Sequence, residues 1–314
     1  MSERRRHRSR QQVSHSTPSP TSPPAFTSSR VLAVVVVGAI VCFLFGLSTD
    51  NWGMRNFVMG FRAWKKIDFS SSPIIIREFN HDSTAFLQGL EFDNTIEEPR
   101  ILYESTGLYG QSVIRKYDLE TGKVLAETPL DKKYFGEGLT VAGDEVYLLT
   151  WREHTVFVYN ASDLSQKRQL SLSTEGWGIC FYEAHRRFII SDGSDYLHFY
   201  SQDDFMPQGK IQVKEPFGKG RFKAVNRINE LELIDGKVWA NVWMQNRIIV
   251  INPDTGIVEN QLNMEHLVDR IHRKGVETQY EAVLNGIAFH RKTRTLIVSG
   301  KLWPNLYQVH TQLT

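Results

Sequence analysis

Five short segments of this 314-residue chain resemble one another, and the repetition restricts the fold more than any other feature. Each segment begins with a polar or aromatic residue and has Leu or Ile at its third position, and the intervals are roughly 40 to 56 residues. In chain order the segments are QGLEF at 88–92, EGLTV at 137–141, WGICF at 177–181, NELEL at 229–233 and NGIAF at 285–289. Such a repeat is a supersecondary unit that buries its apolar face by packing against copies of itself.

Each repeat continues with runs rich in aromatic and β-branched residues, which are typical of β-strands. Second runs lie at 100–107, 145–151, 187–193, 237–243 and 295–301, and third runs at 112–122, 155–163, 196–204, 247–256 and 305–311. Four repeats show a fourth run; the fifth shows none before Thr314, and the apolar run at 73–79 would supply it. This pattern predicts an all-β fold, a five-bladed β-propeller at 73–314 whose last blade is completed by an N-terminal strand. An open β-sandwich is the alternative, but regular repeats favour the propeller.

Two segments interrupt the repeats, at 215–227 and at 264–283. The second has Met264, Leu267, Val268 and Ile271 at helical spacing, which predicts a short amphipathic helix between blades. The first contains a Gly-Lys-Gly triplet at 218–220, but it lacks the Ser or Thr and the following helix of a phosphate-binding loop.

The first residue of each inner strand should point toward one mouth of the central channel, together with the end of each second strand. These two sets are Gln88, Glu137, Trp177, Asn229 and Asn285, and Gly107, Trp151, Gly193, Trp243 and Lys301. They could merely fill the channel, with polar groups bonded through water and tryptophans packed between blades. One carboxylate and one ammonium enclosed by indoles, however, lose hydration unless they serve a purpose, so the set predicts a pocket.

The N-terminal 72 residues differ in character from the repeats. Residues 1–30 are basic and rich in Ser and Pro, which predicts a disordered cytoplasmic tail. Residues 31–47 contain no charged residue and predict a transmembrane signal anchor, with 48–72 as a lumenal linker. A cleaved signal peptide is the alternative, but no small-x-small cleavage site follows.

The distribution of arginines before this segment predicts the orientation. Six arginines precede the apolar run, and positive charge stays on the cytoplasmic side. We therefore expect a single-pass type II membrane protein of the secretory pathway, in the endoplasmic reticulum or the Golgi, with a lumenal catalytic domain. The tail could instead bind nucleic acid, but the net charge of +2 indicates no nucleic-acid partner.

Few residues are suited to metal binding or covalent stabilisation. Of two cysteines, Cys42 lies in the apolar run and Cys180 in the repeats, so the repeats cannot contain a disulfide of their own. The ten histidines show no metal-binding spacing, which predicts an activity independent of metals and cofactors. Asn160 begins an Asn-Ala-Ser sequon and is a candidate glycosylation site.

Several motifs in the repeats resemble the plant-type glutaminyl-peptide cyclotransferases, also called glutaminyl cyclases. The similarity runs from about residue 75 to the C-terminus, in order and in every repeat. It is carried by FLQGL at 86–90, ESTGLYGQS at 104–112, FGEGLT at 135–140, TEGWG at 174–178, NRINELE at 226–232, VWANVW at 238–243, LNGIA at 284–288 and SGKLWP at 299–304.

The resemblance implies an aminoacyltransferase that converts the N-terminal Gln of peptides and proteins into pyroglutamate and releases ammonia, without a cofactor. It implies that Glu137 carries the proton and that the adjacent glycines let the substrate backbone approach. It places Lys301 and Asn229 at the reacting groups, and it assigns the pocket wall to Phe86, Gln88, Trp151, Trp177 and Trp243. The alternative is a non-catalytic, membrane-anchored propeller that binds peptides or proteins at the same mouth. A lactonase-like propeller would need several carboxylates around a metal, and the two sets contain one acid.

Overall fold

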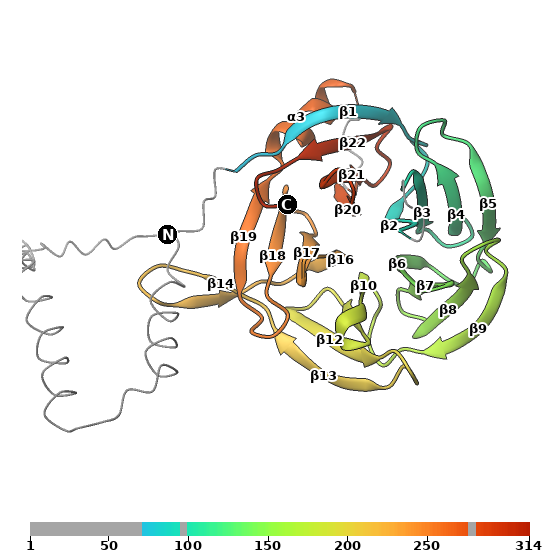
Figure 1. The fold of residues 1–314 in the computed structure, drawn as a ribbon, viewed down its shortest axis with the longest axis horizontal. Helices are drawn as coiled ribbons and strands as arrows, with labels where there is room; N and C mark the ends of the chain where they lie inside the picture. Colours follow the sequence, from blue (N-terminus) through green and yellow to red (C-terminus); the bar gives the residue numbers. More distant parts are fainter. Residues whose placement is uncertain (1–70, 95–98, 276–280) are drawn as a thin grey trace, which may run out of the picture. The chain divides into compact units, whose positions relative to one another are not determined.

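The computed structural model describes residues 71–94, 99–275 and 281–314, which form one compact unit (Figure 1). Within these residues, five four-stranded antiparallel sheets are arranged as blades around a central axis. The all-β five-bladed propeller predicted from the repeats is therefore confirmed. The predicted tail at 1–30, the anchor at 31–47 and nearly all of the linker at 48–72 lie outside the described residues. The described part of the chain contains no helix that is long and apolar enough to cross a membrane.

Each blade begins at the channel and ends at the outer surface. The first blade contains β2 (Leu87–Phe92), β3 (Ile101–Thr106), β4 (Val113–Asp118) and β5 (Val124–Pro129), and the second contains β6 (Gly136–Ala142), β7 (Glu145–Thr150), β8 (Thr155–Asn160) and β9 (Gln166–Ser171). The third contains β10 (Ile179–Tyr182), β11 (Arg187–Ser191), β12 (Tyr196–Ser201) and β13 (Pro207–Gln212), with a short 3-10 helix at Glu183–His185. The fourth contains β16 (Ile228–Ile234), β17 (Lys237–Val242), β18 (Arg247–Ile251) and β19 (Val258–Asn263).

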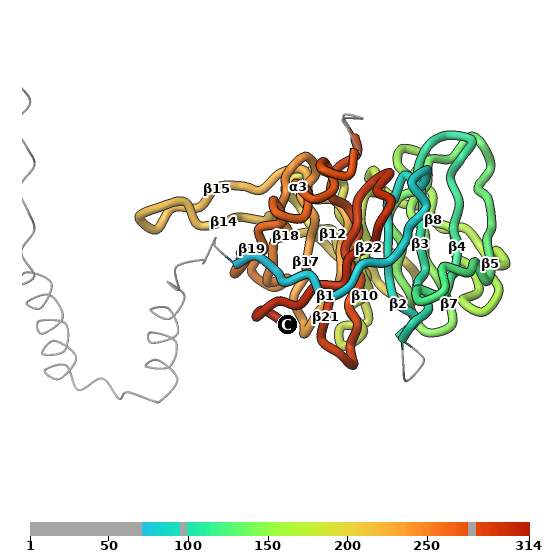
Figure 2. The backbone as a smooth tube through the Cα atoms, turned by 90° about the horizontal axis from the view of Figure 1, so that it is seen from above, coloured from blue at the N-terminus to red at the C-terminus, as the bar shows by residue number. Residues whose placement is uncertain are grey.

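The fifth blade joins the two ends of the described chain. It contains β20 (Leu284–His290), β21 (Thr295–Gly300), β22 (Asn305–His310) and the N-terminal strand β1 (Ile74–Asn80) as its outermost strand. The antiparallel pairing of β1 with β22 runs from Ile74 opposite His310 to Asn80 opposite Asn305. Figure 2 shows β1 lying along β22. The predicted closure by the run at 73–79 is therefore confirmed.

The apolar core lies between adjacent blades. One cluster combines Leu87 and Leu102 of the first blade with Ile297 and Leu306 of the fifth, and similar clusters fill the other blade junctions. The outer strands β1, β5, β9 and β13 expose most of their residues, whereas β19 is largely covered. Inner strands are buried on both faces, because each lies against both neighbouring blades.

The two interruptions are connections from an outer strand to the next inner strand. Between β19 and β20 lies the helix α3 (Glu265–Arg273), which buries Leu267, Val268 and Ile271 and confirms the predicted amphipathic helix. Between β13 and β16 lies a two-stranded hairpin of β14 (Lys214–Pro216) and β15 (Phe222–Ala224), which projects from the ring. The pattern of the sequence did not predict this hairpin.

Candidate active site at one mouth of the channel

A β-bulge interrupts the inner strand of four blades at the position where the repeats align. The pairing register shifts between Leu87 and Gly89, between Gly136 and Leu139, between Ile228 and Leu231, and between Leu284 and Ile287. The residues left unpaired include four of the predicted mouth residues, Gln88, Glu137, Asn229 and Asn285. A bulge leaves the extra residue unpaired and changes the direction of its side chain. In each of these four blades, the aligned residue therefore does not pair with the neighbouring strand. In the third blade the ladder begins later, at Ile179, and Trp177 precedes the strand.

The glycines beside Glu137 serve the packing of the blades. A Cβ atom on Gly136 would lie 2.6 Å from the carbonyl oxygen of Thr106, and one on Gly138 would lie 2.7 Å from the carbonyl oxygen of Trp177. The space next to both glycines is therefore taken by protein backbone. Both glycines let the bulged strand pass close to the blades on either side, and the approach of a substrate backbone to them stays a prediction.

The Glu137 side chain is held in the mouth without a hydrogen bond of its own. Only 5 % of the residue is exposed, and its carboxyl group has no hydrogen-bond partner among the described residues. Its backbone is fixed instead, since the Ser105 hydroxyl donates to the Glu137 carbonyl oxygen at 2.5 Å. Burial raises the pKa of Glu137 well above its ordinary value; Lys301 opposes this, and the nearby Glu175 and Glu153 raise it further.

Lys301 is the cation that faces Glu137. It is 6 % exposed, and its ammonium lies 4.5 Å from the centre of the Phe86 ring. Burial lowers the pKa of Lys301, and the charge of Glu137 partly offsets this. A buried carboxyl and a buried ammonium with pKa values moved toward each other are typical of a site that transfers protons.

The aromatic residues form a continuous wall beside this pair. Phe86 meets Phe135 edge to face at 6.1 Å between ring centres, and Phe135 lies 5.5 Å from Trp151. Trp177 and Trp243 also meet edge to face, at 5.8 Å. The three predicted tryptophans are all partly exposed, as the wall of an open pocket would be.

One carboxylate holds two of these indoles. The Glu175 Oε2 atom accepts the indole N–H of Trp151 at 3.0 Å and that of Trp177 at 3.2 Å. Its other oxygen accepts from the Arg152 guanidinium at 3.2 Å. Glu175 therefore fixes the orientation of two wall residues and adds negative charge close to Glu137.

The two predicted amide side chains lie on the bulges of the first and fourth blades. Gln88 is buried, and its Oε1 atom lies 3.4 Å from the Asn285 amide nitrogen. Asn229 is also buried, and its Oδ1 atom has no hydrogen-bond partner among the described residues. Buried polar atoms are nearly always bonded in folded proteins, so an unpartnered Oδ1 at a pocket is suited to a ligand or a water molecule.

The chain is similar to known proteins in both sequence and fold. Residues 59–311 match the family model described as glutamine cyclotransferase. The chain is 33% identical over 293 residues to the glutaminyl-peptide cyclotransferase of Arabidopsis thaliana, which covers 90% of this chain and 85% of the relative. The crystal structure of Myxococcus xanthus glutaminyl cyclase superposes with a TM-score of 0.68 at 34% identity, over 77% of this chain and 97% of the other.

This chain belongs to the glutamine cyclotransferase family. It is an enzyme of the glutaminyl-peptide cyclotransferase type. The resemblance inferred from the motifs in the repeats is therefore confirmed. The roles of the individual residues stay predictions, because none of these comparisons tests them.

Two residues of the cyclotransferase pocket were not singled out from the sequence. Phe135 joins Phe86 to Trp151, and Glu175 joins Trp151 to Trp177. Both lie inside motifs that carry the family resemblance, FGEGLT and TEGWG. Neither begins an inner strand nor ends a second strand, so the alignment of the repeats did not single them out.

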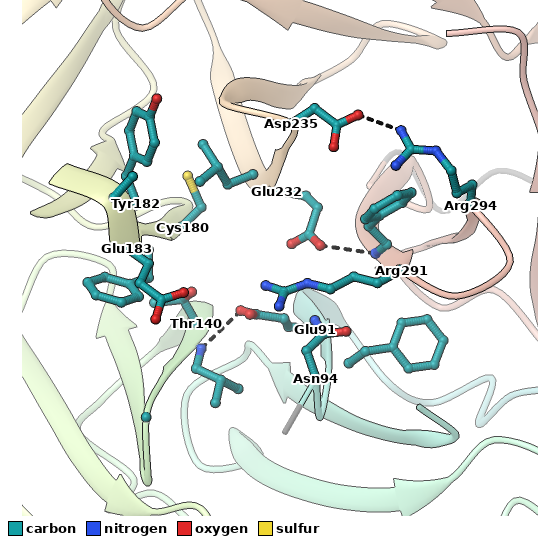
Figure 3. Close-up of a pocket in the computed structure, with 17 residues that line it drawn as sticks. Glu91, Asn94, Thr140, Cys180, Tyr182, Glu183, Glu232, Asp235, Arg291 and Arg294 are labelled. Atoms are coloured by element: carbon teal, nitrogen blue, oxygen red, sulfur yellow. Dashed lines mark hydrogen bonds and ion pairs between the residues drawn. The ribbon is translucent and has the colours of Figure 1, made fainter. Parts of the chain in front are cut away.

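The opposite mouth of the channel holds a separate cavity of about 580 Å³ (Figure 3). None of the predicted site residues lines it. Glu91 accepts the backbone N–H of Val141 at 3.0 Å, and Glu232 accepts that of Phe289 at 3.0 Å, so each carboxyl joins neighbouring blades. Burial raises the pKa of Glu91 to about 7, and burial raises that of Glu232 well above its ordinary value. Throughout the described residues, no group of three or more His, Cys, Asp or Glu side chains is placed to hold a metal ion.

Asn160, the candidate glycosylation site, is the last residue of β8 and is partly exposed. Its side chain accepts hydrogen bonds from the backbone and the hydroxyl of Ser162, both at 3.1 Å, which closes a tight turn. Its glycosylation stays a prediction.

Proposed function

We propose that this enzyme cyclises the N-terminal Gln of peptides and proteins to pyroglutamate, with Glu137 as the proton carrier. The observation that supports this role is the position of Glu137: a buried carboxyl with a raised pKa, free of hydrogen bonds from the described residues, opposite Lys301 and beside an aromatic wall. A group that takes and returns a proton must be able to exist in both forms at the working pH.

The reaction needs one nucleophilic attack and one proton transfer. The nitrogen of the substrate α-amine attacks the carbonyl carbon of its own γ-carboxamide, and the carbonyl oxygen gains negative charge. Glu137 accepts the proton that the attacking nitrogen gives up and donates it to the amide nitrogen. The bond between that nitrogen and the former carbonyl carbon then breaks, ammonia leaves, and the ring closes as pyroglutamate. One carboxyl group is sufficient for both transfers.

Lys301 and Asn229 are the candidates for stabilising the reacting groups. The Lys301 ammonium, buried beside Phe86, is a cation at fixed position, which suits it to the developing oxyanion. The unpartnered Asn229 Oδ1 is a hydrogen-bond acceptor, suited to the N–H groups of the substrate amine or amide.

The aromatic wall is the candidate for positioning. A flexible Gln side chain must fold back on its own amine, and holding that conformer reduces the entropic part of the barrier. Phe86, Trp151, Trp177 and Trp243 present apolar faces for the methylene groups, while Gln88 offers an amide for the substrate backbone.

We also infer that residues 31–47 anchor the enzyme in a membrane of the secretory pathway with the propeller in the lumen. The support is the uncharged run and the six arginines before it. If so, a tag at the C-terminus is protected from protease in sealed microsomes, and the mature chain keeps its N-terminal tail. A mature N-terminus near residue 51 would instead show that the segment is a cleaved signal peptide.

The activity is tested with the full-length protein purified in detergent. Ammonia release from a Gln-initiated peptide is measured together with loss of the free amine. We expect turnover, and we expect it to persist in a strong chelator because Glu137 alone carries the proton. Binding without ammonia release would indicate the non-catalytic alternative, and loss of turnover in chelator, restored by zinc, would contradict the metal-independent chemistry.

A further inference from the structure

The hairpin of β14 and β15 leads directly into the pocket wall. Arg227, at its base, accepts the backbone N–H of Trp243 with its carbonyl oxygen at 2.8 Å, and its guanidinium lies 5.5 Å from the Trp243 ring centre. Its own backbone N–H donates to the carbonyl oxygen of Gly193, the glycine that lies against the Trp177 ring. The next two residues are Ile228 and Asn229. The hairpin is thus an extension of the mouth at which Glu137 lies.

A groove of about 690 Å³ lies under the hairpin. The hairpin lines one side with Phe217, Lys223 and Arg227, and the fourth blade lines the other with Gln245 and Arg247. Arg227 lines this groove and also contacts Trp243, so it connects the groove with the tryptophan wall.

The hairpin carries an excess of positive charge. Its one acid, Glu215, already pairs with Arg247 at 2.6 Å and with Lys223 at 2.8 Å. Lys219, Arg221 and Arg227 are exposed and form no ion pair with any residue that the structure describes. Of these three cations Arg227 lines the groove, whereas Lys219 and Arg221 lie on the hairpin outside its lining.

The hairpin also exposes apolar surface and a strand edge. Phe217 and Phe222 are about half exposed, at 54% and 50%, and the Arg221 and Lys223 side chains lie against the Phe217 ring at 5.6 and 5.4 Å. Among the strands described, β15 pairs only with β14, so its other edge is free to pair with an extended chain. Strand edges bind extended peptides through main-chain hydrogen bonds, and adjacent side chains select the sequence.

We propose that this hairpin and its groove bind the part of the substrate that follows the N-terminal Gln, and that they select for acidic residues in that part. This deepens, and rests on, the proposed cyclisation of Gln peptides. A peptide whose first residue lies beside Glu137 advances by about 3.3 Å per residue when extended, so its following residues reach Arg227 first and then the hairpin. Acidic side chains there would meet Arg227, Arg221 and Lys219.

The test compares the full-length enzyme with the double variant Lys219→Glu, Arg221→Glu. The substrates are a Gln-Ala dipeptide, which is too short to reach the hairpin, and Gln hexapeptides with either three Asp or three Lys at positions 4–6. In the variant, we expect the ratio of kcat/KM for the Asp hexapeptide to that for the dipeptide to fall about fivefold to tenfold, as reversal of two exposed charges implies. The corresponding ratio for the Lys hexapeptide should rise, and both changes should shrink in high salt.

The control is Lys123→Glu, which reverses one charge at an exposed lysine between β4 and β5. It should leave all ratios unchanged. Equal ratios in the double variant and the parent would overturn the proposal. If the double variant then also lost binding to phosphatidylserine vesicles, the hairpin would be assigned to a lipid surface instead.

A binding measurement keeps this proposal separate from the proposed function. The fluorescence anisotropy of a labelled Asp hexapeptide reports on the groove whether or not turnover occurs. Weaker binding to the double variant supports the groove assignment, and unchanged binding contradicts it. An enzyme that binds this peptide but releases no ammonia from the dipeptide would contradict the cyclisation and leave the groove assignment standing.

Discussion

At the scale of single residues, the proposed site depends on one buried acid whose carboxyl group has no hydrogen-bond partner among the described residues. The bulge removes Glu137 from its ladder, the Ser105 hydroxyl fixes its carbonyl oxygen, and the flanking glycines allow the neighbouring blades to close around it. Burial then raises its pKa, and Lys301 limits that rise. The proton-carrying role proposed for Glu137 therefore depends on backbone geometry as much as on its own chemistry.

Replacing Glu137 by Gln keeps the size of the side chain and removes its ability to carry a proton. We expect kcat to fall by about 10²- to 10⁴-fold, the usual contribution of general acid–base assistance, while Gln peptides still bind. The measurement is ammonia release, with thermal unfolding as the check that the variant is folded. A folded variant within about threefold of the parent rate would show that Glu137 only fills the channel.

Replacing Glu175 by Ala should change both the wall and the pH dependence. Trp151 and Trp177 lose their shared acceptor, so we expect KM to rise by about tenfold, with a change in tryptophan fluorescence. Because the negative charge of Glu175 raises the pKa of Glu137, its removal lowers that pKa. The acidic limb of the kcat/KM profile should therefore move to lower pH, whereas an unmoved limb would mean that Glu137 is not the group being titrated.

At the scale of elements, the ring depends on β1, which lies far from the site in sequence. Its pairing with β22 supplies the outermost strand of the fifth blade. Beyond its end, His81 bonds to Glu104 of the first blade at 3.0 Å and to the carbonyl oxygen of Trp303 of the fifth at 2.8 Å. The seam between the first and last blades is thus closed both by a strand and by a buried polar contact. Without it, two blade edges would be exposed to pairing with other chains.

Deleting residues 71–80 should therefore destabilise the whole propeller and promote aggregation. A graded form of the test is Phe79→Ala, which removes a buried ring packed near Leu306 and should cost about 3 to 5 kcal/mol. The matched control is Ile76→Ala on the same strand, a side chain that is 49% exposed. Thermal unfolding followed by size-exclusion chromatography gives the comparison, and equal stabilities for the two variants would contradict closure by β1.

At the scale of the whole molecule, the two mouths of the channel differ in their use of buried acids. At the Glu137 mouth one buried acid, with Glu175 and Glu153 near it, faces one buried cation. At the other mouth, the carboxyls of Glu91 and Glu232 accept backbone N–H groups of neighbouring blades, and Arg291 lies between them in Figure 3. The acids of this second mouth hold the ring together, and their raised pKa values make its stability depend on pH.

Replacing Glu232 by Gln should stabilise the propeller at high pH. The folded pKa of Glu232 lies above its ordinary value of 4.5, so its stabilising contribution is complete below pH 4.5 and is lost as the pH rises through the folded pKa. Gln resembles the protonated carboxyl at every pH. The gain in Tm should thus be near zero below pH 4.5 and be largest at pH 8. Each kcal/mol gained in the free energy of unfolding should raise Tm by about 2 to 4 °C. Glu183→Gln, an exposed acid at the same mouth, is the control, and a gain that does not vary with pH would contradict the linkage.

The sequence alone determined the architecture and most of the pocket. Five blades and their closure could be predicted from the repeat period, the strand composition and the unmatched run at 73–79. The reason is that each blade repeats the same apolar pattern and cannot bury it alone. Aligned positions in the repeats were sufficient to bring Glu137, Lys301 and the three tryptophans to one mouth, since equivalent positions in a closed ring lie at the same level. The motifs then identified the family, which the comparisons confirm.

Only the tertiary structure decided how these residues are held. The contacts of Gly136 and Gly138 with neighbouring backbones, and the hydrogen bond from Trp151 to Glu175, join segments that are distant in sequence. The bulges likewise depend on how two strands pair. The hairpin of β14 and β15 was likewise absent from the pattern, because its short, exposed strands carry no alternation of apolar residues. Periodicity reports which face of an element is buried, whereas the pKa of Glu137 depends on how closely separate blades approach it, and that distance is set by packing.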